Sequence, residues 1–313
     1  MASTTIGKSI LSILALLVFP GGLALVAAGL IYEWIDRKLL AQLQNRVGPR
    51  WFQPLADVVK LLAKEEIVPV GVNPYLFIGL PIFALAGGLT AALYVPLFGL
   101  APSYGFPGDL IVTLYLLSLL TICMGLAGAN TIDRFSVIGA TRTLTQLFSY
   151  EAPFLLALLG PAVAAHSWQI GEITVYSSTH WLILLQPLGF LVAVVGLMGK
   201  LEIPPFDAPE AETEIVAGAL TEYSGRGLAL FQIAKGVEIV IGLTLISAFY
   251  LGGVSDPLMF FVKTLALLLA VVGLQSLMTR LRIDQVVGLW WRYGVLLVLV
   301  QWLAMVVFQG AIL

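Results

Sequence analysis

The chain has 313 residues, of which 59% are hydrophobic and 11% are charged, and its formal net charge is −2. Soluble domains contain about 25% charged residues, so this composition excludes a soluble globular protein. The mean hydropathy of +0.99 and the repeated long apolar stretches instead predict an all-α, polytopic membrane protein. The single cysteine, Cys123, falls inside one of these stretches, where we expect a packed and inert thiol.

Eight stretches are candidate membrane spans, on the criterion that a span needs about 20 mainly apolar residues. They cover residues 10–32, 75–98, 110–129, 150–165, 182–199, 229–251, 258–278 and 294–312. The fourth and fifth are short and contain prolines, so we expect them to be tilted, broken or partly re-entrant. The first is too long for the apolar core of a signal peptide and is interpreted as a retained span. The sequence shows no repeat or linker, which indicates one helical domain over residues 1–313.

The basic residues lie on one side of this predicted bundle. Thirteen of the 16 lysines and arginines fall in the segments that follow spans one, three, five and seven. Cytoplasmic loops are enriched in lysine and arginine, so these segments are expected to face the cytoplasm, with both termini outside. The one-sided charge favours either a large partner on that face or loops that fold inward over a cavity.

The first charged segment, residues 33–69, contains a predicted amphipathic helix from Gln53 to Glu66. Its apolar residues recur at helical spacing with charged residues opposite, which is typical of a helix on the membrane surface. The helix either anchors the chain at the headgroups or forms a contact surface for a partner. Arginines near its start could hold a carboxylate-bearing ligand. The candidate cavity or partner-contact residues are Arg37, Arg46, Arg50, Asp57 and Lys60, with Arg142 of the next charged segment.

Glu151 closes the second charged segment and opens the fourth predicted span. An ionisable group at membrane depth is costly and is therefore a functional candidate by default. Near the end of a span, it could instead reach the interface or support the start of a helix. We favour the functional interpretation, in which Glu151 takes part in proton coupling.

Residues 200–226, KLEIPPFDAPEAETEIVAGALTEYSGR, hold a third of the acidic residues of the chain. The six carboxylates are Glu202, Asp207, Glu210, Glu212, Glu214 and Glu222. Asp207 and Glu210 have the spacing of a capping box, and Pro209 fits the first turn of a helix. Local helix chemistry therefore explains two or three of these acids and leaves the others unexplained.

The unexplained acids are predicted to couple protons. Glu214 lies four residues after Glu210 on the same predicted face, where like charges repel. Crowded carboxylates beside a low-dielectric region should have raised, coupled pKa values and can pass protons. The alternative is an acidic surface that pairs with a partner. On the first interpretation, Glu214→Gln should slow or uncouple turnover while assembly stays intact.

The sixth predicted span contains two ionisable residues, Lys235 and Glu238. Their i,i+3 spacing places them on one face of a helix. They form either a neutralised internal pair or a proton-relay pair, and both require a face that meets protein or water.

Motifs for a self-contained catalytic or cofactor site are absent from the sequence. There is no nucleotide-binding glycine motif, no HExxH and no CxxC. The two histidines, His166 and His180, share one outer loop without support from cysteine, so no metal site is expected. No cofactor is expected in this chain, and no nucleic-acid partner.

Three stretches resemble one family, in order, along nearly the whole chain. They are IDRKLLAQLQNRVGPRWFQPLADVVKLLAKE, LTQLFSYEAP and IPPFDAPEAETEIVAGALTEYSGRGLALF. The chain is similar to the H-subunit (subunit 1) family of respiratory complex I, which includes relatives in group 4 membrane-bound nickel–iron hydrogenases and ferredoxin-dependent complexes. The run with PPFD, PEAE and EYSG is the most specific part of the resemblance.

This resemblance implies a subunit that links a peripheral electron-transfer arm to a proton- or sodium-translocating membrane arm. The implied partners are iron–sulfur and large hydrogenase-like subunits on the cytoplasmic face, antiporter-like and small membrane subunits at the sides, and the lipid bilayer. Iron–sulfur clusters, or a nickel–iron centre, would belong to partners, and quinone would enter in the complex I branch. Matching motif positions place Glu151, Glu210, Glu212 and Glu214 in a carboxylate path, Asp207 and Glu222 in the same run, and Arg37, Arg46 and Asp57 in the first-loop motif.

The hydrogenase-like branch is favoured within this resemblance. The chain passes directly through QNRVGPRWFQP, where complex I subunits carry a longer RPGPNRVGP-type turn, and it has IDRK in place of an ERK-type sequence. LRIDQ also looks closer to that branch, whereas PPFDAPEAE and EYSG are close to complex I. We therefore expect an anchoring and coupling subunit without a complete catalytic site, in a prokaryotic plasma membrane. The alternatives are a complex I subunit that forms the quinone chamber and a stand-alone secondary transporter, for which a repeat would be typical.

Overall fold

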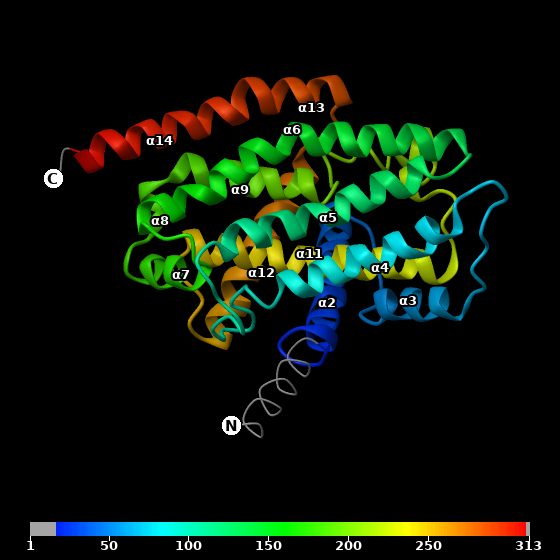
Figure 1. The fold of residues 1–313 in the computed structure, drawn as a ribbon, viewed down its shortest axis with the longest axis horizontal. Helices are drawn as coiled ribbons and strands as arrows, with labels where there is room; N and C mark the ends of the chain where they lie inside the picture. Colours follow the sequence, from blue (N-terminus) through cyan, green and yellow to red (C-terminus); the bar gives the residue numbers. More distant parts are fainter. Residues whose placement is uncertain (1–16, 311–313) are drawn as a thin grey trace.

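The computed structural model describes residues 17–310, which form helices joined by turns and loops, with no β-strand in that range (Figure 1). The helices are α2 (Gly22–Leu43), α3 (Gln53–Ala63), α4 (Pro74–Ala91), α5 (Asp109–Ala129), α6 (Arg134–Ala165), α7 (Ile170–Thr179), α8 (Leu182–Leu185), α9 (Pro187–Lys200), α10 (Glu212–Ile215), the 3₁₀ turn η1 (Gly218–Leu220), α11 (Gly225–Tyr250), α12 (Pro257–Leu277), α13 (Ile283–Leu289), the π-helical turn η2 (Trp290–Gly294) and α14 (Val295–Gly310). Side-chain caps start two long helices, because Asn73 accepts a hydrogen bond from the backbone N–H of Tyr75 and Asp133 accepts one from that of Ser136.

Six helical segments within the described residues are long and apolar enough to cross a membrane. They are Pro74–Ala91, Asp109–Ala129, Arg134–Ala165, Gly225–Tyr250, Pro257–Leu277 and Ile283–Met305. They correspond to predicted spans two, three, four, six, seven and eight. The prediction of an all-α polytopic membrane protein is therefore confirmed.

Two of these helices start earlier than hydropathy predicted. α6 begins at Arg134 rather than near residue 150, and the last span begins at Ile283 rather than at residue 294. Hydropathy marks only the apolar part of a helix. The backbone hydrogen bonds continue through polar residues where these can face other polar groups of the protein.

The fifth predicted span is broken, as its proline suggested, whereas the fourth is not, because α6 continues through Pro153 and Pro161. α8 and α9 are separated at the buried residue Gln186, whose Nε2 donates to the carbonyl oxygen of Gly160 at 3.2 Å. α9 has 14 residues, so it is about 21 Å long and shorter than the hydrocarbon layer of about 30 Å.

The first predicted span, 10–32, lies partly outside the described residues. Within the described residues, the helix is interrupted by a bend from Phe19 to Gly21. α2 follows this bend and ends at Leu43, beyond residue 32, where the predicted span ended.

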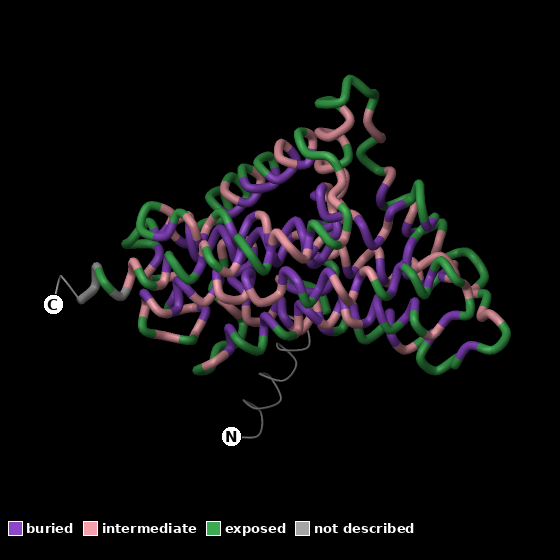
Figure 2. Tube along the Cα trace, turned by 90° about the horizontal axis from the view of Figure 1, so that it is seen from above, coloured by how far each residue is buried: buried purple, intermediate pink, exposed green. Residues whose placement is uncertain are grey.

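α11 is the central helix of the bundle and contacts α2, α4, α9 and α12 (Figure 1). Every residue of α11 from Val240 to Tyr250 is buried. α2 crosses α11 where Gly29 meets Gly236, and a Cβ on Gly29 would lie 2.7 Å from the carbonyl carbon of Gly236. Glycine permits this close approach of the two backbones. Figure 2 shows buried residues in the interior and exposed ones along the outer faces.

The predicted amphipathic helix is confirmed as α3, which starts at Gln53 as expected and ends at Ala63 instead of Glu66. It packs against α2 and α11 through the buried residue Val58. Leu55 and Val59, on the same helix, are exposed. α3 therefore presents apolar side chains to lipid or to another protein.

Candidate functional site

The acidic segment, residues 201–224 between α9 and α11, enters the bundle instead of lying on its surface. α9 ends at Lys200, whose side chain is buried. Gln146 of α6 holds the following residues in place, because its Nε2 donates to the carbonyl oxygens of Gly199 at 2.9 Å and Phe206 at 2.7 Å. The acidic segment therefore starts in the interior and reaches the charged face on its way to α11.

Lys200 and Glu238 form the innermost ion pair. The Nζ of Lys200 lies 3.0 Å from Oε1 of Glu238 and donates to the carbonyl oxygen of Leu117 at 2.8 Å. Leu117 is near the middle of α5 and Glu238 near the middle of α11, so the pair lies deep in the bundle. Both side chains are at most 4% exposed. Because removing two charges from water is costly, each charge depends on the other for compensation.

Lys235 lies one turn before Glu238 on α11 and pairs with two carboxylates of the acidic segment. Its Nζ lies 3.4 Å from Oε2 of Glu202 and also donates to Oε1 of Glu210. Glu202 is buried, whereas the side chain of Glu210 is 46% exposed. The expected pair between Lys235 and Glu238 is not formed, because Glu238 pairs with Lys200 instead. We call these five residues, Lys200, Glu202, Glu210, Lys235 and Glu238, the ion-pair chain.

The predicted capping box is wrong. No helix starts at Asp207, and the short helix α10 covers only Glu212–Ile215. Asp207 pairs with Arg280, and Glu210 pairs with Lys235. Asp207 and Glu210, which local spacing had assigned to a helix start, are therefore bound by basic side chains from distant parts of the chain.

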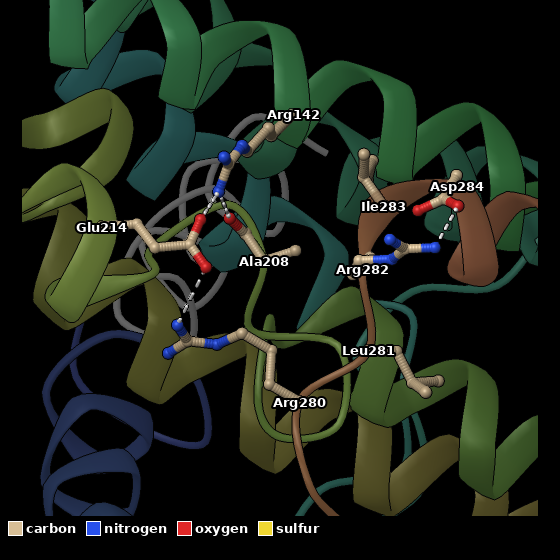
Figure 3. A pocket seen from close by; sticks show the side chains of 8 residues that line it. All are labelled: Arg142, Ala208, Glu214, Arg280, Leu281, Arg282, Ile283 and Asp284. Carbon is tan, nitrogen blue, oxygen red and sulfur yellow. Dashed lines mark hydrogen bonds and ion pairs between the residues drawn. The ribbon is translucent and has the colours of Figure 1, made fainter.

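Two arginines bind the outer acids beside a cavity of about 490 Å³. Nη1 of Arg142 donates to Oε2 of Glu214 at 2.8 Å and to the carbonyl oxygen of Ala208 at 3.2 Å. Nη2 of Arg280 donates to Oδ2 of Asp207 at 2.6 Å, and its Nη1 lies 3.9 Å from Oε1 of Glu214. Figure 3 shows the two arginines reaching Glu214 from opposite sides. This cavity has a charged wall.

Glu202 and Glu214 have opposite electrostatic environments. Burial raises the pKa of Glu202 from 4.5 to about 7, against the opposing effect of Lys235 and with a further increase from Glu210. The hydrogen bond and charge of Arg142 lower the pKa of the exposed Glu214. Near neutral pH, Glu202 can therefore gain or lose a proton, while Glu214 stays ionised. A proton-holding role fits Glu202 better than Glu214.

Replacing Glu214 with glutamine is expected to change turnover less than Glu202→Gln at neutral pH. In this variant Arg142 can still donate to the carbonyl oxygen of Ala208, and Arg280 can still donate to Asp207, so each arginine retains a hydrogen-bond acceptor. Because the pKa of Glu214 is lowered, its stabilising ion pair is fully present above the ordinary value of 4.5 and is lost as pH falls through the lowered value.

Thermal midpoints of the original protein and Glu214→Gln, measured between about pH 3 and 7, should therefore converge at the acid end. A larger loss of turnover in Glu214→Gln than in Glu202→Gln would show that Glu214 takes part in proton transfer.

The first charged segment joins α2 to α3 through Arg37. This side chain pairs with Glu33 on its own helix and lies 3.7 Å from Oδ2 of Asp57 on α3. Nε1 of Trp34 donates to the carbonyl oxygen of Pro49 at 3.3 Å and fastens the turn between the helices. The structure thus brings together Arg37 and Asp57, two of the predicted contact residues.

The other predicted site residues lie outside these pairings. Within residues 17–310, no ion pair is formed by Arg46, Arg50, Lys60, Glu151, Glu212 or Glu222. Glu151 and Glu222 are half-buried, and the rest are exposed. The exposed residues can meet a partner or solvent, and none of the six joins the ion-pair chain directly.

Sequence reasoning missed Lys200, Gln146 and Arg280 as site residues. Lys200 directly follows an apolar stretch, which was a signal that its charge lies close to the membrane interior. Gln146 and Arg280 carry no comparable local signal, because their importance comes from contacts with residues 53 or more positions away.

These features define a polytopic membrane protein with ionisable side chains held inside a helical bundle. A family model described as NADH dehydrogenase matches residues 12–306. The chain belongs to this family, and the predicted likeness to the H subunits of respiratory complexes is confirmed.

Curated relatives show the same likeness over most of their length. The H subunit of NADH-quinone oxidoreductase from Carboxydothermus hydrogenoformans is 32% identical, over 93% of this chain and 86% of the relative. The H subunit numbered 2 of the NADH-quinone oxidoreductase from Geobacter sulfurreducens is 33% identical, over 85% of this chain and 87% of the relative.

A solved structure shares the fold at low sequence identity. It is a chain of the membrane-bound sulfane sulfur reductase, an archaeal respiratory membrane complex, with a TM-score of 0.83 and 22% identity. The similarity covers 94% of this chain and 98% of the other. The helical arrangement is therefore common to both proteins.

Proposed function

We propose that this chain is the membrane-anchoring and coupling subunit of a redox-driven ion pump. It links an iron–sulfur peripheral arm on the charged face to antiporter-like subunits in the membrane. The observation that supports this role is the ion-pair chain, in which Lys235 binds the half-exposed Glu210 and the buried Glu202, and Lys200 binds Glu238, one turn after Lys235 on α11. Ionised groups at such depth are costly and point to ion movement.

Lys235 is the branch point of the proposed mechanism, because it binds Glu202 and Glu210 at the same time. If a redox event in a partner draws Glu210 away, Lys235 faces Glu202 alone. The carboxylate of Glu202 is then favoured, and its proton is released. The return of Glu210 reverses the change and favours proton uptake. Movement of one outer carboxylate thereby controls the protonation of a buried one.

Within the family, we favour the hydrogenase-like, ferredoxin-dependent branch. The first-loop sequence supports this choice. The names of the curated relatives favour the alternative, a subunit that forms the quinone chamber of complex I. Inhibition of the purified complex by a quinone-site blocker would support that alternative.

The proposed partners carry the redox cofactors. Iron–sulfur clusters, with a nickel–iron centre in the hydrogenase case, belong to peripheral subunits on the charged face. By the distribution of lysine and arginine, that face is cytoplasmic, both termini lie outside, and the membrane is a prokaryotic plasma membrane.

The test is ion translocation by the purified complex carrying Glu210→Gln. This variant has a neutral side chain opposite Lys235, so we expect fewer ions moved per electron while electron transfer continues. Glu65→Gln is the matched control, because it removes an exposed carboxylate that makes no ion pair within the described residues and is not a candidate site residue. Equal ion-to-electron ratios in the two variants, or full activity of this chain purified alone, would contradict the proposal.

A further inference from the structure

A separate groove lies along the C-terminal helix, and none of its lining residues belongs to the ion-pair chain. Its volume is about 350 Å³, and its lining includes Trp291, Arg292, Leu296, Leu299 and Leu303. From Arg292 to Leu303 the groove follows the helix for about 16 Å. Its wall is apolar except at the end formed by Arg292, so charge and apolar surface are separated along its length.

The π-helical turn η2 sets which side chains face outward at that end. Trp290 is buried against Phe206, with ring centroids 5.5 Å apart. The next three residues turn outward, with Trp291 56% and Tyr293 64% exposed and Arg292 exposed between them. Turns of this kind are frequent at functional sites, because they redirect side chains within an otherwise regular helix.

Arg292 is an exposed cation on a helix long and apolar enough to span the membrane. Among the described residues it has no acidic partner, whereas Arg280 and Arg282 both pair with carboxylates. A charged side chain facing lipid is costly unless it reaches the polar headgroups. The flanking Trp291 and Tyr293 are typical of the headgroup level.

We propose that this groove binds an anionic phospholipid, with the phosphate at Arg292 and one acyl chain along the helix toward Leu303. Arginine binds phosphate through paired hydrogen bonds, and Leu296 and Leu299 supply apolar contacts below it. The cation at one end of an apolar groove matches a phospholipid, in which a charged headgroup lies at one end of apolar acyl chains. This site is independent of the proposed ion pumping.

The experiment is lipid binding to the purified complex that contains this chain, after lipid depletion, measured by native mass spectrometry. Phosphatidylglycerol is expected to bind more tightly than phosphatidylcholine, and Arg292→Gln should weaken phosphatidylglycerol binding about fivefold. Arg282→Gln is the matched control, because it removes an exposed arginine that does not line the groove. Leu299→Trp should also reduce binding, since it fills the groove while Arg292 remains.

Three results would overturn the proposal. One is unchanged phosphatidylglycerol affinity in Arg292→Gln. The second is loss of another protein component from the Arg292→Gln complex with unchanged lipid content, which would make the groove a contact for a partner helix. The third is displacement of phosphatidylglycerol by an equal concentration of inorganic phosphate, which would show a free-anion site without acyl-chain binding.

Discussion

Replacing Lys200 with methionine is expected to destabilise the folded bundle by about 3–5 kcal/mol, since it leaves the carboxylate of Glu238 buried without a cation. The two side chains are 3.0 Å apart and at most 4% exposed. The carbonyl oxygen of Leu117 also loses its lysine donor. We expect a lower thermal midpoint for the purified complex and less assembled complex in membranes.

A double variant distinguishes the effect on stability of removing the whole ion pair from the effect of leaving one charge unpaired. In Lys200→Met/Glu238→Gln neither side chain is charged, so most of the lost stability should return. Lys64→Met is the control for the same substitution at an exposed lysine without an ion pair among the described residues. Normal stability of Lys200→Met would show that the Lys200–Glu238 pair does not stabilise the fold. A double variant no more stable than Lys200→Met would show that the loss of stability does not come from the unpaired charge of Glu238. If the pair also serves coupling, the restored complex should transfer electrons but move fewer ions.

Replacing Glu202 with glutamine is expected to remove a step near pH 7 from the pH dependence of turnover. Burial raises the pKa of Glu202 to about 7, so this side chain changes protonation within the working range of the protein. Glutamine cannot hold or release the proton. If the barrier to proton transfer rises by about 1.4 kcal/mol, coupled turnover falls about tenfold.

The same shift predicts a dependence of stability on pH. Between pH 4.5 and about 7, the folded protein holds a proton on Glu202 that the unfolded chain releases. The contribution of this group to stability therefore declines as pH rises through that window. Glu202→Gln should remove the decline, which thermal midpoints across the window can measure.

Glu65→Gln, at an exposed carboxylate after α3, should keep both the decline and the step in turnover. Identical pH profiles for the original protein and Glu202→Gln would exclude Glu202 from the proton path.

Sequence reasoning located the acidic segment but assigned wrong partners to two of its acids and to the ionisable residues of α11. Helical spacing paired Lys235 with Glu238 and Asp207 with Glu210, since these residues are three positions apart. In the structure, Lys200 takes Glu238 and Arg280 takes Asp207. Local spacing describes which residues share a face of a regular helix. It fails around Asp207, where the chain folds as turns, and on α11, where Lys200 from another helix binds Glu238.

Hydropathy and helical periodicity were sufficient to predict the helical class, most of the membrane spans and the amphipathic helix α3. Apolar length and helical periodicity act within one segment, so they can be read without knowing the neighbouring segments. In contrast, the entry of the acidic segment into the bundle and the position of Lys200 beside Glu238 depend on contacts between distant segments. Those contacts join α5, α9 and α11. Their energies depend on burial and on distances between helices, which spacing along the chain does not encode.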